Sequence, residues 1–527
     1  MLDPAARAGA LERMRRERFD LLVVGGGITG TGIALDAATR GLSVALVEAS
    51  DIAAGTSSRS SKLIHGGLRY LEMLDLGLVR EALRERRLLL TRVAPQLVRP
   101  VPFLFPLRHR FWERPYIGAG LLLYDSMGGA RHVPRARHLS KRAALRSAPA
   151  LRPDALVGAV RFHDAQEDDA LYAVCVSRTA AAHGAAIATR AAVTAFVRDE
   201  GGRVGGAEVR DGLAGATFAV QARHTVAAVG VGTDRVLELA TGRAHHELHP
   251  SKGVHVLVPR AAIPMRIGLF MRTERSIFHA IPWGADHWLL GDTDTEWDGG
   301  PDAPVANRAD VDYLLAKVSS VLVRPVGRAE VCGVYAGLRP LVAAAGSAAT
   351  TKLSRQHRLF HPLPGLTAIA GGKYTTYRVM ARDAVDAAAR DLGGTVAASR
   401  TADVPLLAEG DHEVRALAES DPALAGRIPG AAHHVMAAAV HACTHQGALD
   451  LDDILARRMR VAIEVPDRGR AAAAAVAPVV APVLGWSDAR AAEEVARYVR
   501  LRDAEAAAEA APDDISAQAA YREMMRR

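Results

Sequence analysis

The first informative pattern of apolar and polar positions lies near the start of the chain, over residues 19–48. Residues 21–24 form an apolar run that is too short for a helix and is followed by glycines, which predicts a buried parallel strand. The stretch after it has apolar side chains at helical spacing, and a second apolar run follows at residues 44–47. This order predicts a strand, a helix and a second parallel strand.

The rest of the chain predicts antiparallel strands and a helical C-terminal part. Within residues 151–230, an alanine-rich helical stretch is followed by short strand-like runs that are separated by glycine-containing turns, which predicts a small antiparallel meander. Alternating apolar positions at 254–258 and 288–290 predict antiparallel strands of a second sheet. Beyond about residue 400, Ala, Arg and Glu dominate at helical spacing, so we expect a separate C-terminal helical domain.

Length and composition narrow the class of protein. A chain of 527 residues is too long for one core, so we expect two or three domains. The net charge of +8 favours acidic partners, but with 5% aromatic residues and no interleaved basic and aromatic strand we expect no nucleic-acid binding. The three widely spaced cysteines are typical of a reducing compartment. No signal peptide is evident, and the longest apolar stretch, 471–486, is too short to span a membrane and contains two prolines.

The turn after the first strand carries a G-x-G-x-x-G motif at Gly25, Gly27 and Gly30. Gly25 permits a tight turn, Gly27 lets the backbone approach a pyrophosphate, and Gly30 lets the helix pack closely on the strand. Glu48, at the end of the second strand, is placed to accept hydrogen bonds from ribose hydroxyls. The motif predicts a dinucleotide cofactor, and by itself it does not choose between NAD and FAD.

The next segment, residues 50–72, is rich in hydroxyls and glycines and predicts a loop. Loops at the carboxyl ends of parallel strands are where ligands bind in such sheets. Ser57 and Ser58 can donate hydrogen bonds to pyrophosphate oxygens. Gly66 and Gly67 would let the backbone lie flat against a planar ring.

Three segments far apart in the sequence each pair glycine with a basic residue, at Arg69, Arg339 and Lys373. If they converge, with the Tyr70 hydroxyl beside them, they suit a phosphate-bearing substrate better than a keto acid. Taken singly, each is better explained as a surface salt bridge. His255 is a candidate base for a hydroxyl proton while a hydride leaves carbon, and a packed strand histidine is the alternative.

Two further features concern membranes and metals. Residues 99–129 mix proline, aromatic, leucine and basic residues without a steady period, which fits either an interfacial membrane surface or core packing. The arginine-rich residues 1–18 predict a frayed helix with solvated charges. His441, Cys443 and His445 have a spacing found in metal sites, but no fourth ligand is evident, so we expect no metal.

At these motifs the chain resembles the FAD-dependent sn-glycerol-3-phosphate dehydrogenases. The resemblance is carried by VGGGITGTGIALDAATRG at 24–41 and GGKYTTYRVMA at 371–381, with further matching segments at 57–72, 252–259, 281–297 and 452–460. It implies an α/β fold with a Rossmann-like FAD-binding domain of the glutathione-reductase type, an antiparallel-sheet substrate domain and an all-helical C-terminal domain. The domains expected are an FAD-binding domain of residues 19–95, 151–244 and 331–395, a substrate-binding cap of 96–150 and 245–330, and a helical domain of 400–527.

The resemblance also implies a reaction. The chain would oxidise sn-glycerol 3-phosphate to dihydroxyacetone phosphate with noncovalent FAD and pass electrons to a membrane quinone. It would be cytoplasmic, peripheral on the inner face of the cell membrane and in contact with its anionic surface; a homodimer is left open.

The resemblance assigns the site residues one by one. His255, Arg339 and Lys373 would be catalytic, and the substrate would be held by Arg69, Tyr70, Arg339, Arg355 and Lys373. The expected FAD contacts are Gly25, Gly27, Ile28, Thr29, Gly30, Glu48, Ala49, Ser57, Ser58, Lys62, His65, Gly66, Gly67, Gly230, Gly372, Lys373, Thr375 and Thr376. One departure is that residues 227–232 are AAVGVG where the family has Asn and Trp, which leaves Gly230 as a backbone contact.

Three alternatives stay open. The nearest is a glycerol-3-phosphate oxidase that reduces oxygen to hydrogen peroxide in the same pocket. A second is an FAD-binding protein without catalysis, which loss of Arg339 or Lys373 would have favoured. A third is an amino-acid oxidase, which should hold its substrate with one arginine in an apolar pocket rather than with several cations.

Overall fold

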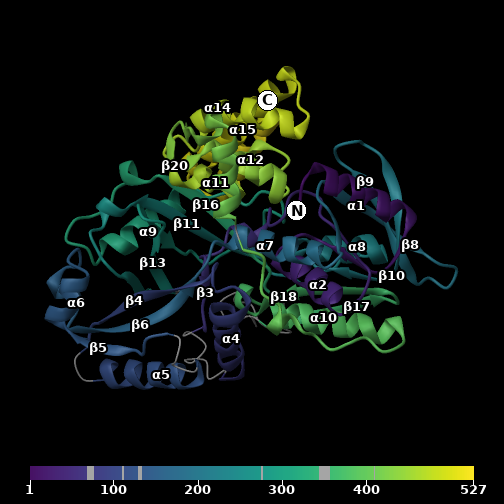
Figure 1. The fold of residues 1–527 in the computed structure, drawn as a ribbon. Coiled ribbons are helices and arrows are strands. Elements are labelled where there is room, and N and C mark those ends of the chain that lie inside the picture. The colour runs from purple at the N-terminus through teal and green to yellow at the C-terminus, as the bar shows by residue number, and fades with distance from the viewer. Residues whose placement is uncertain are drawn as a thin grey trace.

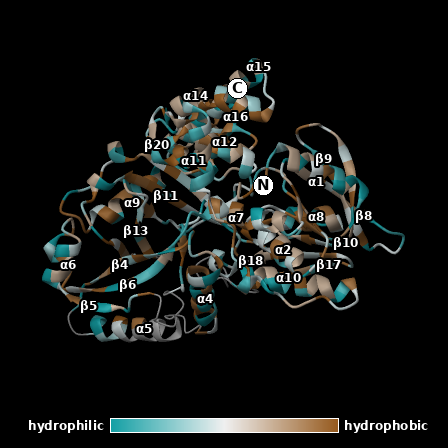
Figure 2. Ribbon diagram, viewed as in Figure 1, coloured by the Kyte–Doolittle hydropathy of each residue, from teal (hydrophilic) through white to brown (hydrophobic). Residues whose placement is uncertain are grey.

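The computed structural model describes residues 1–67, 76–109, 112–128, 133–273, 277–342, 356–408 and 410–526, apart from the side chains of residues 119 and 122–128. In Figure 1 the chain forms two β-sheets that lie side by side, with the C-terminal helices above their junction. Figure 2 shows hydrophobic residues concentrated in the strands of both sheets. The two sheets therefore organise separate apolar cores.

The first sheet is built on β1 (Arg18–Val24), which pairs in parallel with β2 (Val44–Val47) and β10 (Thr217–Ala227). Helix α2 (Ile28–Thr39) connects β1 to β2, so the predicted strand, helix and strand are confirmed. All four residues of β2 are buried, as expected for a parallel strand covered on both faces. The described strands run in the order β17 (His357–Leu363), β18 (Leu366–Gly371), β10, β1, β2 and β7 (Ala186–Ala188).

The two faces of this sheet are covered by different elements. On one face, α2 packs with α7 (Asp169–Ala182) and α10 (Tyr377–Leu392). On the other face lie α1 (Pro4–Arg16) and the strands β8 (Ala191–Arg198) and β9 (Val204–Asp211). With the first half of β10 these two strands form an antiparallel meander, which confirms the predicted one. The expectation of a frayed N-terminal helix is wrong. Asp3 caps α1 by accepting a hydrogen bond from the Ala6 backbone N–H, and Met14 is fully buried.

The second sheet is largely antiparallel. The pairing of β11 (Ser251–Pro259) with β14 (His287–Gly291) confirms the strands predicted from alternation. The described strands run in the order β15 (Thr295–Glu296), β11, β14, β13 (Ile277–Trp283), β12 (Gly268–Arg272), β4 (Arg99–Leu107), β6 (Gly158–Gln166) and β3 (Leu63–Ile64), with β16 (Gly333–Arg339) beside β11 and β5 (Arg137–Ser140) beside β6. The strands β3, β6 and β16 thus pair here, although their residues fall in ranges expected to form the FAD-binding domain.

The segment considered for membrane contact divides into two parts. Residues 99–107 form β4, most of which is buried in the second sheet, so core packing explains this part. Trp112 and Tyr116, at the start of α5 (Glu113–Gly128), are 55% and 51% exposed. The remaining helices described before residue 400 are α4 (Leu76–Leu88), α6 (Lys141–Ser147), α8 (Thr233–Thr241) and α9 (Arg308–Ser319).

The C-terminal part is helical, as expected. Its helices are α11 (Asp411–Ser420), α12 (Met436–His445), α13 (Val461–Glu464), α14 (Arg470–Leu484), α15 (Asp488–Ala510) and α16 (Asp514–Arg526), with a hairpin of β19 (Arg427–Ile428) and β20 (Ala431–Val435). Among the helices within the described ranges, none combines the length and the apolar character needed to cross a membrane.

Buried ion pairs join this C-terminal part to the first sheet. Arg457 Nε lies 2.6 Å from Asp51 Oδ2, and Arg458 Nη2 lies 2.7 Å from Asp51 Oδ1. Arg190, just after β7, lies 2.6 Å from Asp450 and 2.7 Å from Asp453. Since Asp51 lies in the loop that follows β2, the C-terminal helices fix a loop at the carboxyl end of the first sheet.

Candidate active site

One cavity of about 740 Å³ opens between the two sheets. The carboxyl ends of β1, β2 and β10 contribute to its wall on one side, and β11, β16 and the segment after β14 contribute on the other. Fifteen of the residues predicted from the sequence line it: Gly25, Gly27, Ile28, Thr29, Glu48, Ala49, Ser57, His65, Gly67, Gly230, His255, Arg339, Gly372, Lys373 and Thr375. Arg69, Tyr70 and Arg355 lie outside the described residues.

The glycines of the first turn are required by its geometry. Gly25 has φ +109°, and a Cβ there would lie 2.5 Å from the Ala228 carbonyl oxygen. A Cβ on Gly30 would lie 1.9 Å from the Gly25 carbonyl oxygen. A side chain at Gly25 would collide with the segment after β10, and one at Gly30 would push α2 away from the turn, so both glycines keep the backbone within reach of a bound pyrophosphate.

Polar groups already organise this end of the cavity. Glu48 accepts hydrogen bonds from the Gly26 N–H at 2.6 Å and from the Ser50 N–H at 2.7 Å. Burial raises the pKa of Glu48, although these two N–H groups favour its charged form. The Ser57 hydroxyl oxygen accepts from the Ile28 N–H at 2.9 Å, at the start of α2. This is the arrangement of acceptor acid and helix N-terminus that suits a ribose and a pyrophosphate.

Five predicted cofactor contacts, namely Gly30, Ser58, Lys62, Gly66 and Thr376, are absent from the described cavity lining. Lys62 is fully buried, and its Nζ lies 2.7 Å from Asp169 Oδ1 and 3.2 Å from the Ser58 carbonyl oxygen. Arg460 pairs with the same Asp169 from the C-terminal part. Lys62 therefore supports the loop that carries Ser57.

Arg339, at the end of β16, is held by acidic and carbonyl oxygens. Its Nη2 pairs with Asp292 and donates to the Thr293 carbonyl at 2.9 Å, and its Nη1 lies 3.5 Å from Asp294 Oδ1. Burial alone would raise the pKa of Asp292, but the Arg339 guanidinium outweighs it and the pKa falls to about 2. The carboxylate is thus charged at neutral pH and oriented toward Arg339. Sequence reasoning missed both acids, although they directly follow the strand predicted at 288–290.

His255 lies on β11 and is 2% exposed. Its Nε2 is 2.9 Å from the hydroxyl of Ser61, which also lines the cavity, and its ring stacks on Tyr335 at a centroid distance of 4.9 Å. Burial lowers the pKa of His255 to about 3, so the ring is neutral at physiological pH and one of its nitrogens has a lone pair. A second histidine of the cavity wall, His279, was not predicted, and its Nδ1 lies 2.8 Å from the Gly291 carbonyl oxygen.

The segment after β18 brings the second predicted cation to the cavity. Gly371 and Gly372 have φ of +78° and +80°, conformations that favour glycine, and Lys373 follows them directly. Thr375 donates to the His65 carbonyl oxygen at 3.3 Å, which ties this segment to the loop before residue 68. Lys373 and Arg339 thus line one cavity with His255, as the sequence predicted for residues far apart in the chain.

The cavity therefore combines two sets of groups. Glycines, a helix N-terminus and Glu48 fit a dinucleotide, and the glycine positions show that close backbone approach is built in. Two cations and a neutral histidine fit a small anionic substrate with a hydroxyl to be deprotonated.

Comparison with known proteins gives a consistent result. The sequence profile described as "FAD dependent oxidoreductase" matches residues 20–378, and that of the "C-terminal domain of alpha-glycerophosphate oxidase" matches residues 410–491. Glycerol-3-phosphate dehydrogenase 2 of Mycobacterium tuberculosis is 49% identical, with 98% of this chain and 93% of the relative covered. The mitochondrial glycerol-3-phosphate dehydrogenase of Homo sapiens is 38% identical over 76% of this chain and 56% of the relative.

A solved structure agrees over nearly the whole chain. The glycerol-3-phosphate dehydrogenase from Bacillus halodurans complexed with FAD has a TM-score of 0.74 and 26% identity, with 96% of this chain and 98% of that chain covered. The fold is thus the α/β FAD-binding fold of these oxidoreductases with a C-terminal helical domain, and FAD is the cofactor. On its sequence and its fold, this chain belongs to the FAD-dependent glycerol-3-phosphate dehydrogenase family.

Proposed function

We propose that this protein oxidises sn-glycerol 3-phosphate to dihydroxyacetone phosphate and passes the electrons to a membrane quinone. The observation that carries the proposal is the convergence of Arg339, Lys373 and His255 on a cavity that also holds the dinucleotide turn. The mycobacterial relatives are named for this dehydrogenase activity, and they match over nearly the whole chain.

In this proposal some cavity residues bind the cofactor and others bind the substrate. Gly25, Gly27, Ser57 and Glu48 hold the adenosine and pyrophosphate of FAD, whose oxidised ring accepts a hydride from the substrate carbon. Arg339 and Lys373 bind the phosphate and orient the hydroxyl-bearing carbon, which is positioning by charge-assisted hydrogen bonds. Arg69, Tyr70 and Arg355 stay predicted further contacts.

Binding of the phosphate competes with an ion pair that is already present. Arg339 Nη2 is engaged by Asp292, so the phosphate has to share or displace this carboxylate. Tight binding of a dianion therefore depends on Lys373 in addition to Arg339. A neutral alcohol carries no charge to bind Arg339 and Lys373, so this arrangement favours the phosphate ester over the free alcohol.

His255 is the proposed acceptor of the hydroxyl proton. Its Nδ1 is buried without a hydrogen-bond partner among the described residues, whereas its Nε2 lies 2.9 Å from a cavity-lining hydroxyl, so Nε2 is the nitrogen on the cavity side. We expect His255→Asn to lower kcat about 10²–10⁴-fold with little change in KM, because general-base catalysis contributes that much. Stopped-flow flavin reduction would measure it. Ser61→Ala is the control, with a smaller loss; unchanged flavin reduction in His255→Asn would contradict the assignment.

The direct test of the function is the flavin spectrum of the purified holoenzyme. Anaerobic glycerol 3-phosphate should bleach the oxidised flavin, while glycerol and amino acids should not. A flavin that glycerol 3-phosphate leaves oxidised would refute the proposal, and bleaching by an amino acid would favour the amino-acid oxidase.

The electron acceptor needs a separate experiment, since an oxidase that produces hydrogen peroxide is the second candidate. We expect the rate of turnover with a quinone analogue under anaerobic conditions to be well above the rate of peroxide formation in air. The reverse ratio would identify an oxidase.

Quinone as acceptor implies that the protein lies on the cytoplasmic face of a membrane. Trp112 and Tyr116 are exposed side by side, with the exposed Arg108 nearby in sequence, which suits an interfacial contact with anionic lipid. We expect the double variant Trp112→Ser/Tyr116→Ser to bind anionic vesicles several-fold less than wild type in flotation assays. Leu213→Ser, which removes an exposed apolar side chain on the meander, is the control. Equal flotation of all three proteins would place the lipid contact elsewhere.

A further inference from the structure

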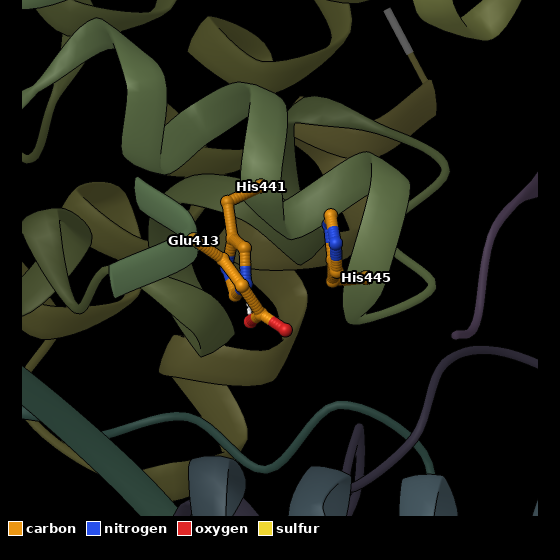
Figure 3. Close-up of side chains that lie close together, drawn as sticks. All are labelled: Glu413, His441 and His445. Carbon is orange, nitrogen blue, oxygen red and sulfur yellow. Dashed lines mark hydrogen bonds and ion pairs between the residues drawn. The ribbon is translucent and has the colours of Figure 1, made fainter. Parts of the chain in front are cut away.

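Three potential metal ligands meet in the C-terminal helical part. Glu413 on α11 and His441 and His445 on α12 each offer one ligand atom, and these atoms all lie within 4.8 Å of one another. His441 Nε2 is 2.9 Å from Glu413 Oε2, and the two imidazole rings stack at a centroid distance of 4.6 Å (Figure 3). We propose that these three side chains bind a divalent transition-metal ion of the zinc class.

The ligand set depends on the helix pairing. His441 and His445 are one helical turn apart and therefore project from one face of α12. Glu413 comes from α11, which packs against α12 and supplies the third ligand that the local sequence lacks. Cys443, between the two histidines, is fully buried in the apolar core of this part and is not a ligand.

The distances are close to those of a coordinated ion. Zinc bonds of about 2.0–2.2 Å to nitrogen and oxygen place tetrahedral ligand atoms roughly 3.3–3.5 Å apart. His441 Nε2 and Glu413 Oε2, which are 2.9 Å apart, are close to this separation. The widest separation among the three ligand atoms is at most 4.8 Å and has to decrease when an ion binds. A small movement of the His445 side chain, which is only partly buried, can provide that change.

The hydroxyl of Thr444 orients the His445 ring. Thr444 Oγ1 donates to the Val440 carbonyl oxygen at 3.0 Å, so it is left to accept from His445 Nδ1, which lies 2.7 Å away. The proton of a neutral His445 is then on Nδ1, and Nε2 keeps its lone pair. Orientation of a histidine through its other nitrogen is the usual second contact of a metal-binding imidazole.

Nearby positive charges oppose the ion, and one of them is the N-terminal ammonium, whose charge acts on His445. Arg178 on α7 has its Nη2 3.7 Å from Glu413 Oε2, so its positive charge weakens cation binding while it helps to hold the carboxylate. With three protein ligands the fourth position is left to water. We therefore expect an affinity below that of closed four-ligand zinc sites.

A bound metal would lie where the C-terminal helices contact the N-terminal segment. The Leu2 N–H donates to the His445 carbonyl oxygen at 3.2 Å, and Arg178 belongs to a helix of the first sheet. A metal that links α11 to α12 at this place would stabilise this pair of helices and their contact with the N-terminal segment, while its charge repels Arg178 of α7.

The test is calorimetric titration of untagged, chelator-treated holoenzyme with Zn²⁺, with Co²⁺ absorption to report the coordination. We expect one site and a raised unfolding temperature with Zn²⁺. Thr444→Val should weaken binding about 10–100-fold, the typical effect of losing an outer-shell partner. Glu413→Gln, His441→Asn and His445→Asn should each weaken it by more.

His412→Asn is the matched control, because His412 is an exposed histidine next to Glu413 on the same helix. It should bind Zn²⁺ as wild type does. The flavin spectrum and circular dichroism establish that each variant is folded. Absence of a wild-type site, or unchanged affinity in His441→Asn/His445→Asn, would overturn the proposal, the latter as adventitious binding.

Discussion

Replacing Arg339 by alanine is expected to lower kcat/KM for glycerol 3-phosphate by about 30-fold to several thousand-fold, which corresponds to roughly 2–5 kcal/mol for a lost buried charge pair. Arg339 lines the cavity on β16 and its side chain is 21% exposed, so its charge is little screened by water. The loss should lie mainly in KM, because the phosphate is bound in both the ground state and the transition state. Flavin reduction at varied substrate concentration would measure it.

Two controls make this result specific. Arg339→Ala also leaves Asp292 without its partner, so the double variant Arg339→Ala/Asp292→Ala separates lost substrate contact from an unpaired carboxylate. Arg328→Ala removes an exposed arginine that pairs with Asp312 away from the cavity, and it should have little effect. An unchanged KM in Arg339→Ala with FAD still bound would show that the phosphate lies elsewhere.

Asp51→Ala is expected to destabilise the protein by about 3–5 kcal/mol, the usual cost of removing one partner from a buried ion pair. Asp51 is fully buried and receives hydrogen bonds from both Arg457 and Arg458. The substitution leaves two guanidinium groups in the interface without this carboxylate. Urea unfolding of the holoenzyme, followed by flavin and tryptophan fluorescence, would measure the change.

The same substitution should loosen FAD. Asp51 lies in the loop after Glu48, and the Ala53 N–H in this loop donates to the Gly26 carbonyl oxygen at 3.0 Å. A displaced loop therefore disturbs the acid that is expected to bind the ribose. Asp403→Ala, which breaks the exposed pair with Arg92 away from the cavity, is the control with little expected effect. Equal unfolding midpoints for both variants would contradict a stabilising role of the Asp51 contacts.

The local features of this protein were determined by sequence alone. The βαβ unit around Gly25, Gly27 and Gly30 follows from short apolar runs, helical spacing and the steric freedom of glycine, all of which act within about thirty residues. The meander of β8, β9 and β10 follows from alternation and turns in the same way. These interactions are between residues close together in the chain, and therefore the sequence pattern predicts them.

Only the tertiary structure decided which distant groups meet. Strand and helix pairing bring together segments that have no shared local pattern. The resulting contacts are those of Asp292 with Arg339, Asp169 with Lys62, and Glu413 with His441. The same reason explains why β3, β6 and β16 pair in the second sheet. A basic residue in a sequence is equally compatible with solvent, an ion pair or a ligand. The difference is set by the carboxylates and the buried surface that the fold places around it.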